Sequence, residues 1–200
     1  CTHCGVRLAA AGLPESSPSQ SLPVGTSLQG GRYQVIGQLG QGGMGAVYLA
    51  RDMELFGRLC VVKQMRPFFA TQSERRKAEA DFKREAEVLT RLNQPGHPRI
   101  PEVYGYFVEG LDQFLVMKYI EGESLEQRLE RLKRPLAETE VIRSAQAVAS
   151  ALVYLHSRRP QPVMHRDIKP ANIIVDPEGR VSLVDFGLAR AVISSGARVM

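Results

Sequence analysis

The chain has 200 residues, of which 44% are hydrophobic and 24% charged, and its formal net charge is +5. This composition is that of a globular protein and excludes a wholly disordered or collagen-like chain. The charge favours an ordinary soluble surface, and the alternative is a partner that carries phosphate. Apolar runs such as Phe114–Met117 are far shorter than the roughly 18 residues of a membrane span. We expect a cytoplasmic protein, with no nucleic-acid partner and no membrane contact from this segment.

Residues 1–7 contain the motif Cys1-Thr2-His3-Cys4. Its C-x-x-C spacing is that of a zinc knuckle, and two ligands make half of a tetrahedral site. We therefore expect a partial zinc-ribbon-like knuckle whose other half precedes residue 1, in a chain that starts as a fragment. The alternative is a pair of unrelated reduced thiols. With Cys60 the chain has three cysteines, too few for a disulfide scaffold.

Residues 8–31 are rich in Ser, Pro and Gly and contain one charged residue, Glu15. Such a segment buries too little apolar surface to offset the entropy of ordering it, so the composition predicts a flexible linker.

Periodic apolar segments begin at Arg32 and predict strands in the first half and helices in the second. This order favours an α+β fold of two lobes with a cleft between them. The expected strands are Tyr33–Leu39, Ala46–Ala50, Arg58–Gln64, Tyr104–Glu109, Phe114–Tyr119, Pro162–Met164, Ile173–Val175 and Val181–Leu183. The expected helices are Glu74–Asn93, Ser124–Lys133 and Glu138–Ser157, the last with an apolar face of Val141, Ala145, Val148, Leu152 and Leu155.

A glycine motif, Gly40-Gln41-Gly42-Gly43-Met44-Gly45, joins the first two long strands. A dinucleotide-binding fold needs a helix directly after such glycines, and here a strand follows. The alternatives are an ordinary glycine-rich hairpin turn and a hairpin whose backbone N–H groups cover phosphates.

Lys63 ends the apolar strand segment Cys60-Val61-Val62-Lys63. Burying a lysine is costly without a partner, unless the side chain reaches water. Glu85 lies within the apolar stripe of the next helix, formed by Phe82, Ala86, Leu89 and Leu92, so we expect an ion pair between Lys63 and Glu85.

The segment His165-Arg166-Asp167-Ile168-Lys169-Pro170-Ala171-Asn172 is far less expected by chance than the glycine motif. Phosphoryl transfer from ATP needs a carboxylate near the incoming hydroxyl, a cation near the phosphoryl group and oxygen ligands for Mg²⁺. Asp167, Lys169 and Asn172 provide these groups from one loop, and Asp185-Phe186-Gly187 adds a second carboxylate.

The order of these motifs resembles the protein kinase family, specifically the bacterial Hanks-type serine/threonine kinases, over residues 32–200. The resemblance implies a bilobal protein-kinase-like fold with a five-stranded N-lobe carrying one helix, over residues 32–120 with the hinge. Residues 121–200 would be part of a mainly helical C-lobe, C-terminally truncated and ending in the activation segment. It also implies ATP-dependent transfer to Ser/Thr hydroxyls of protein substrates, with autophosphorylation.

The same resemblance implies roles for individual residues. Asp167 would be the catalytic base, Lys169 would stabilise the γ-phosphate, and Lys63, held by Glu85, would bind the α/β-phosphates. Asn172 and Asp185 would hold Mg²⁺. The ATP site would be formed by Leu39, Gly40, Gly42, Gly45, Val47, Val61, Lys63, Met117, the hinge Lys118-Tyr119-Ile120, and Ile174. Leu89, His165 and Phe186 would join the lobes.

Some positions depart from the family pattern: Val61 replaces a usual Ala and Lys118 a common hinge Glu. The chain also ends 13 residues after Gly187, so we expect a longer natural protein and poor activity from this segment alone. Two other readings stay open: a nucleotide-binding pseudokinase or scaffold without turnover, and a small-molecule kinase of related fold.

Overall fold

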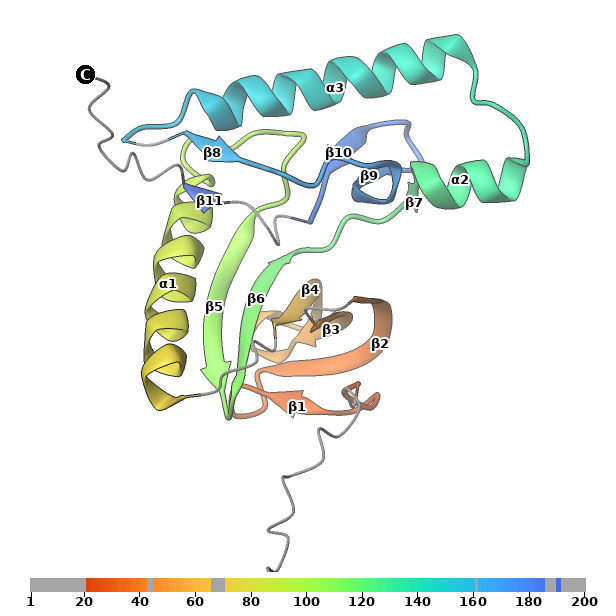
Figure 1. The fold of residues 1–200 in the computed structure, drawn as a ribbon. Helices are drawn as coiled ribbons and strands as arrows, with labels where there is room; N and C mark the ends of the chain where they lie inside the picture. The colour runs from red at the N-terminus through yellow and green to blue at the C-terminus, as the bar shows by residue number, and fades with distance from the viewer. Residues whose placement is uncertain (1–20, 43–44, 66–70, 161, 186–189, 192–200) are drawn as a thin grey trace, which may run out of the picture.

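The computed structural model describes residues 21–42, 45–65, 71–160, 162–185 and 190–191. An antiparallel six-stranded sheet forms one part of the molecule, with helix α1 (Gln72–Arg91) alongside strand β5 (Val103–Glu109) (Figure 1). Helices α2 (Leu125–Leu132) and α3 (Glu138–His156) form the other part with short strands. The predicted two-lobed α+β arrangement is confirmed at this level.

The six strands lie in the order β1-β2-β3-β4-β6-β5. Their bounds are β1 Ser27–Leu28, β2 Tyr33–Gly42, β3 Gly45–Asp52, β4 Arg58–Met65, β5 Val103–Glu109 and β6 Asp112–Lys118. The last five of these match the predicted strands. The two-residue strand β1 lies at the edge of the sheet, beside the five strands that were expected.

Of the expected linker over 8–31, residues 8–20 lie outside the described residues, whereas residues 21–31 are part of the fold. Val35 N–H donates to Thr26 O at 2.9 Å, and Gly25 N–H donates to Val35 O at 2.8 Å. Leu28 is 3% exposed in the core of the sheet. The backbone hydrogen bonds and this buried leucine offset the ordering entropy that the composition alone made prohibitive.

The two faces of the sheet pack in two different hydrophobic cores. Tyr48, Val62 and Val116 pack on the outer face in a core that contains the stacked rings of Tyr33, Phe107 and Phe114. The opposite face carries Val61, Leu115 and Met117, which join the core of α1, α3 and the short strands. Because side chains alternate along a strand, the residues of the predicted ATP site on β3, β4 and β6 share this second face.

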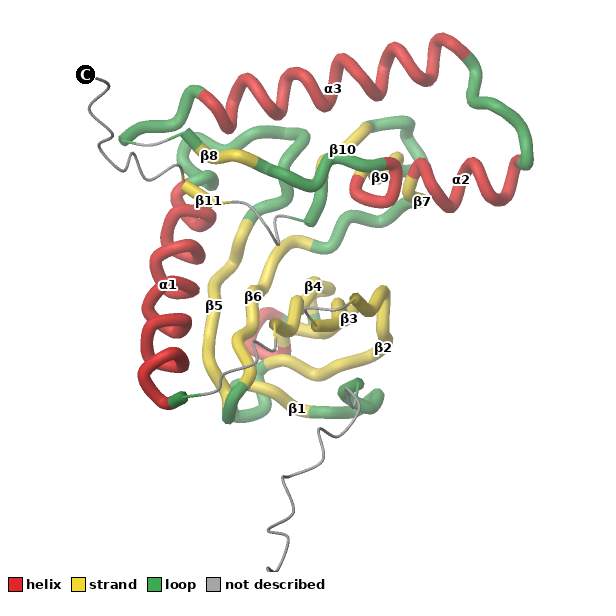
Figure 2. Tube along the Cα trace, in the orientation of Figure 1, coloured by secondary structure: helices red, strands yellow, loops and turns green. Residues whose placement is uncertain are grey.

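Short elements complete the second part (Figure 2). Their bounds are β7 Glu123–Ser124, β8 Val163–Met164, the 3-10 turn Pro170–Asn172, β9 Ile173–Val175, β10 Val181–Leu183 and β11 Arg190–Ala191. α2 begins with a capping box between Ser124 and Gln127, which satisfies two N–H groups of its first turn. Among the described helices, none combines the length and apolar character required to cross a membrane.

The two long helices differ in how well their buried faces were predicted. On α1 the stripe Phe82, Ala86, Leu89 and Leu92 is buried, as expected. On α3 the prediction was wrong at its N-terminal end: Val141 is 50% exposed and Ala145 is also exposed. The buried line of α3 is Ser144, Ala147, Ala151 and Leu155. α3 contacts β8 and β10, and small side chains on this line allow the helix to approach the strands closely.

Candidate active site

The loop from His165 to Asn172 brings the predicted catalytic side chains together. Asp167 Oδ2 lies 2.9 Å from Lys169 Nζ, and Asn172 Nδ2 donates to the same oxygen at 3.0 Å. The hydrogen bond from Lys169 is the main cause that lowers the pKa of Asp167, and the pKa of Lys169 is correspondingly raised. The loop therefore holds an ionised carboxylate beside a cation at neutral pH.

The buried imidazole of His165 holds this loop by hydrogen bonds. Its side chain is 1% exposed. Its Nδ1 accepts from the Asp167 backbone N–H at 3.4 Å, so Nε2 carries the proton and donates to Val184 O at 3.1 Å. Burial lowers the pKa of His165, which favours this neutral form. The imidazole thus links the loop of Asp167 to the strand end that carries Asp185.

Two site residues have left-handed backbone conformations. Arg166 has φ 65° and Asp185 has φ 66°. Non-glycine residues adopt this region at an energetic cost and are found there most often at functional sites. A hydrogen bond from Val184 N–H to Asn172 O, 2.9 Å long, ties the Asp185 strand end to the catalytic loop.

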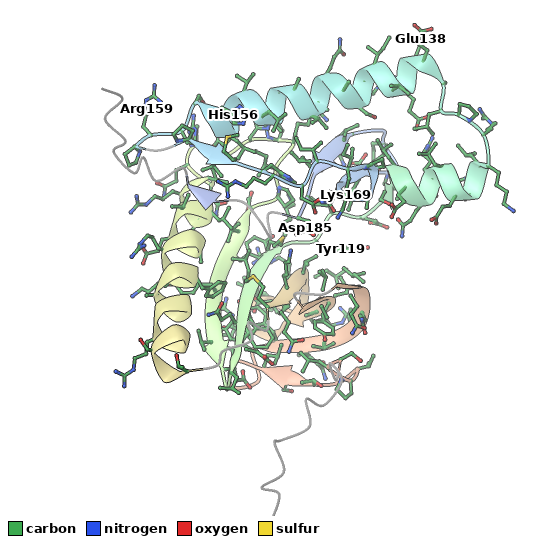
Figure 3. The ribbon with its side chains drawn as sticks, viewed as in Figure 1. Tyr119, Glu138, His156, Arg159, Lys169 and Asp185 are labelled. Carbon is green, nitrogen blue, oxygen red and sulfur yellow. The ribbon has the colours of Figure 1, made fainter. Side chains whose placement is uncertain are left out.

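Lys63 and Asp185 connect the two parts of the molecule. The Lys63 ammonium contacts the Asp185 carboxylate in an ion pair, and the side chains are 16% and 34% exposed. Lys63 comes from β4 of the large sheet, whereas Asp185 follows β10. Figure 3 shows Asp185 and Lys169 near each other where the two parts meet. The predicted partner Glu85 has its side chain outside the described residues, so the Lys63–Glu85 pair stays a prediction.

Residues predicted to line the nucleotide pocket are paired with one another across neighbouring strands. Gly40 pairs with Val47, which pairs with Lys63, and Val61 pairs with Met117. Met117 is buried, whereas Val47, Val61, Tyr119, Ile120 and Ile174 are half-buried and Leu39 is 49% exposed. Lys118 is exposed and its N–H donates to Glu102 O at 2.8 Å. These apolar groups and Lys63 therefore lie near the predicted hinge segment Lys118–Ile120.

In the glycine motif, Gly45 has no room for a side chain because the neighbouring strand β4 lies too close. Gly45 has φ +144°, and a Cβ there would lie 2.0 Å from Gln64 O. A Cβ at Gly40 would meet nothing within 4 Å. Gly42 pairs with Gly45 across the turn, and Gly43 and Met44 lie outside the described residues.

Several predicted residues fall outside the part that the structure describes: Cys1, Cys4, Phe186 and Gly187. Within the described ranges there is no group of three or more His, Cys, Asp or Glu side chains that could hold a metal ion by themselves.

Sequence reasoning missed two positioning residues, Tyr154 and Asn93. Tyr154 Oη donates to Leu92 O at 2.7 Å and accepts from Gly96 N–H at 3.2 Å. Asn93 exchanges two hydrogen bonds with the backbone of Val103, at 2.7 and 3.0 Å. These contacts fix the loop between α1 and β5 against α3. A buried tyrosine hydroxyl needs a partner, but nothing in the sequence indicates which one.

The comparison with known proteins decides the family. The protein kinase domain family matches residues 33–200 of this sequence. The chain belongs to the protein kinase family. It is 38% identical over 174 residues to serine/threonine-protein kinase B of Synechocystis, covering 86% of this chain and 29% of that protein. It is 35% identical over 167 residues to PrkC of Bacillus subtilis, covering 82% of this chain and 24% of PrkC.

The structures of kinases agree with this assignment. The PknI kinase domain of M. tuberculosis superposes with a TM-score of 0.67 at 34% sequence identity, covering 84% of this chain and 62% of that domain. The chain spans less than a third of the length of the two relatives named above.

Proposed function

We propose that this protein transfers the γ-phosphoryl group of ATP to serine and threonine hydroxyls of protein substrates, and phosphorylates itself. The observation that supports this most is the Lys63–Asp185 contact. It joins a cation of the large sheet to a carboxylate beside the catalytic loop, where Asp167 lies within hydrogen-bond distance of both Lys169 and Asn172. Phosphoryl transfer depends on positioning charges in this way.

The residue roles in this proposal follow from chemistry and position. Asp167 accepts the proton of the attacking hydroxyl, for which its lowered pKa keeps it ionised at neutral pH. Lys169, whose side chain is 51% exposed, neutralises charge on the phosphoryl group. Lys63 binds the α/β-phosphates, and Glu85 holds Lys63 in place. The glycine hairpin covers the phosphates with backbone N–H groups.

The adenine site in this proposal uses the face of the sheet described above. Val47, Val61 and Met117 would contact the base from the large sheet, with Leu39 at the rim and Ile174 of β9 from the other side. The hinge segment Lys118–Ile120 would supply backbone hydrogen bonds. Half-buried aliphatic side chains of this kind bury the faces of a flat base.

Asn172 and Asp185 fit a magnesium ion by their chemistry. The Asn172 amide nitrogen donates to Asp167 O at 2.8 Å and to Asp167 Oδ2 at 3.0 Å, which leaves the amide oxygen as a possible ligand. Asp185 adds a carboxylate, the hard oxygen donor that Mg²⁺ prefers. The ion would neutralise the β- and γ-phosphates when it is bound with ATP.

Autophosphorylation of the full-length protein tests this function. With Mg²⁺ and radiolabelled ATP we expect label on serine or threonine, and an Asp167→Asn variant should lose it by about 10²-fold or more. Glu178→Gln, at an exposed acid in the turn between β9 and β10, is the matched control and should retain it. A full-length protein that binds Mg·ATP but transfers no phosphoryl group would be a pseudokinase. Transfer to a small molecule and to no protein would also contradict the proposal.

We also propose that Cys1 and Cys4 are half of a zinc site in a cytoplasmic protein. The C-x-x-C spacing supports this. Purified full-length protein should contain bound zinc that a Cys4→Ser variant lacks, and equal zinc content in both would contradict the site.

A further inference from the structure

A second pocket of about 260 Å³ lies between α2, the start of α3 and the turn that joins β9 to β10. None of its lining residues belongs to the candidate active site. The pocket combines aliphatic groups of Val175, Pro177 and Val181 with polar side chains from α2 and α3. Figure 1 shows these elements meeting at the end of the molecule where α2 is followed by α3.

Ser144 gives this pocket an unmet hydrogen-bonding group. The residue is 5% exposed, lines the pocket, and its hydroxyl has no hydrogen-bond partner among the described residues. Buried hydroxyl groups are nearly always hydrogen-bonded, because leaving one without a partner costs free energy. A ligand with a polar group at this depth would supply that partner.

The charges around Ser144 distinguish what kind of ligand fits. Arg128 Nε lies 2.5 Å from Glu140 Oε1, so the two side chains form an ion pair. The angles at these atoms do not meet those of a hydrogen bond. The carboxylate of Asp176 accepts from the Arg180 side chain at 2.5 Å and from its backbone N–H at 2.7 Å. Both acids of the pocket are therefore already neutralised, so the pocket has no vacant site for a cation.

Arg143 is the cation that remains available. Across the described ranges of the chain it makes no ion pair or hydrogen bond, and its guanidinium lies over the turn, 3.4 Å from where a Cβ on Gly179 would be. A guanidinium binds carboxylates through paired N–H groups. Arg143 and Ser144 are neighbours in sequence, so both donors belong to one turn of α3.

The N-terminus of α3 adds to the preference for an anion. This 19-residue helix begins at the N-cap Ala137, which makes no side-chain capping hydrogen bond. Its first N–H groups carry the positive end of the helix dipole, and Ala137 and Thr139 line the pocket. Of the two acids in the first turn, Glu140 is paired with Arg128, and Glu138 points away from β9 and β10 (Figure 3).

We infer that this pocket binds the carboxylate side chain of an acidic peptide segment from a protein partner. The carboxylate would bind Arg143 and the Ser144 hydroxyl, and its aliphatic stem would pack on Val175 and Val181. A volume of about 260 Å³ suits one amino-acid side chain better than a drug-sized ligand, for which pockets of about 300–1,000 Å³ are usual. The site goes beyond phosphoryl transfer and does not depend on turnover.

Binding of short peptides to the 200-residue chain tests this inference without any activity measurement. The probes are two capped pentapeptides, acetyl-Ala-Ala-Glu-Ala-Ala-amide and its Gln counterpart, followed by amide chemical shifts. We expect the Glu peptide to shift Thr139, Ser144 and Gly179 but not Asp167, and to bind several-fold tighter than the Gln peptide. Arg143→Gln should weaken Glu-peptide binding by about five- to tenfold, as loss of a charge-assisted hydrogen bond does.

Two further variants test whether peptide binding depends on this pocket or only on the positive charge of the protein. Arg134→Gln should leave binding unchanged, because this exposed arginine has Pro135 O as its one side-chain hydrogen-bond partner among the described residues. Ser144→Ala should weaken binding and leave the melting temperature the same or higher, because it removes a buried hydroxyl without a partner. Equal binding of the two peptides, or no effect of Arg143→Gln, would overturn the inference. Binding of acetate or inorganic phosphate in place of the peptide would also overturn it, since the site would then take free anions.

Discussion

At the scale of single residues, the contact between Lys169 and Asp167 controls the ionisation of the proposed base. Asp167 acts when it is deprotonated, so activity falls as the pH drops through its pKa. Lys169 lowers that pKa. A Lys169→Met variant should therefore lose activity at a higher pH than the wild type, in addition to its lower maximal rate.

The pH–rate profile of the full-length protein measures this shift. Lys83→Met removes an equal charge from the exposed surface of α1 and serves as the control. If the acid limb of the Lys169→Met profile has the wild-type midpoint, then Lys169 does not set the ionisation of Asp167.

Gly45 and Gly40 give a matched pair within the glycine motif. A Cβ at Gly45 would lie 2.0 Å from Gln64 O at a φ of +144°, whereas a Cβ at Gly40 meets nothing within 4 Å. Gly45→Ala should destabilise the chain by more than about 2 kcal/mol, and Gly40→Ala by less than about 1 kcal/mol. Urea denaturation measures both, and equal losses would contradict the structural role of Gly45.

Residues close together in the sequence were easier to assign to one site than residues far apart. Asp167, Lys169 and Asn172 were predicted as a group and lie together, because all three belong to one short loop. The contact of Lys63 with Asp185 joins positions 122 residues apart. No local pattern encodes such a pair, and only the resemblance to kinases placed both residues at one nucleotide.

At the scale of elements, the hydroxyl of Tyr154 fastens the loop after α1 to helix α3. It donates to Leu92 O and accepts from Gly96 N–H. Tyr154→Phe should lower the free energy of unfolding by about 1–2 kcal/mol, since it leaves partly buried backbone groups without this partner. Tyr106→Phe is the control, because the Tyr106 ring packs on Phe82 and its hydroxyl makes no hydrogen bond to described residues. Equal stability of the two variants would contradict this role.

Two histidines make these connections sensitive to pH. Burial lowers the pKa of His97, which lies between α1 and β5, and that of His165 in the catalytic loop. The unfolded chain therefore binds protons at a pH where the folded chain does not, so stability is present above the unfolded pKa of about 6.5 and is lost as the pH falls through the folded values.

Denaturation between pH 7.5 and pH 5, with NMR titration of the imidazoles, measures this effect. His165→Gln should reduce the pH dependence in this range. A folded-state pKa of His165 above that of an unstructured peptide would give the dependence the opposite sign and contradict the assigned hydrogen bonds.

The helices show how far periodicity predicts packing. The buried face of α1 was predicted because large apolar residues recur there at helical spacing. The face of α3 was misplaced because its buried line includes Ser144, Ala147 and Ala151, small residues that a search for large apolar side chains passes over. The two-residue strands β1, β7 and β11 are too short to show any periodicity.

At the scale of the whole molecule, the arrangement follows from one sheet that faces two cores. Leu115 and Met117 join the core shared with the second part, whereas Val116 between them packs with Tyr48 and Val62. The sequence predicted a strand over Phe114–Tyr119, and its continuous apolar run Phe114–Met117 is of the kind found in strands buried on both faces. It could not indicate which face meets α1, because that depends on contacts between distant segments.

Magnesium-dependent ATP binding tests most directly whether the two parts form one nucleotide site. Calorimetric titration of the 200-residue chain with ATP, with Mg²⁺ or with EDTA, requires no turnover. We predict Mg²⁺-dependent binding that Lys63→Met weakens by about tenfold or more, and an Asp185→Asn variant that has lost the Mg²⁺ dependence. Binding that is unchanged by EDTA and by both substitutions would contradict a shared site for Lys63 and Asp185.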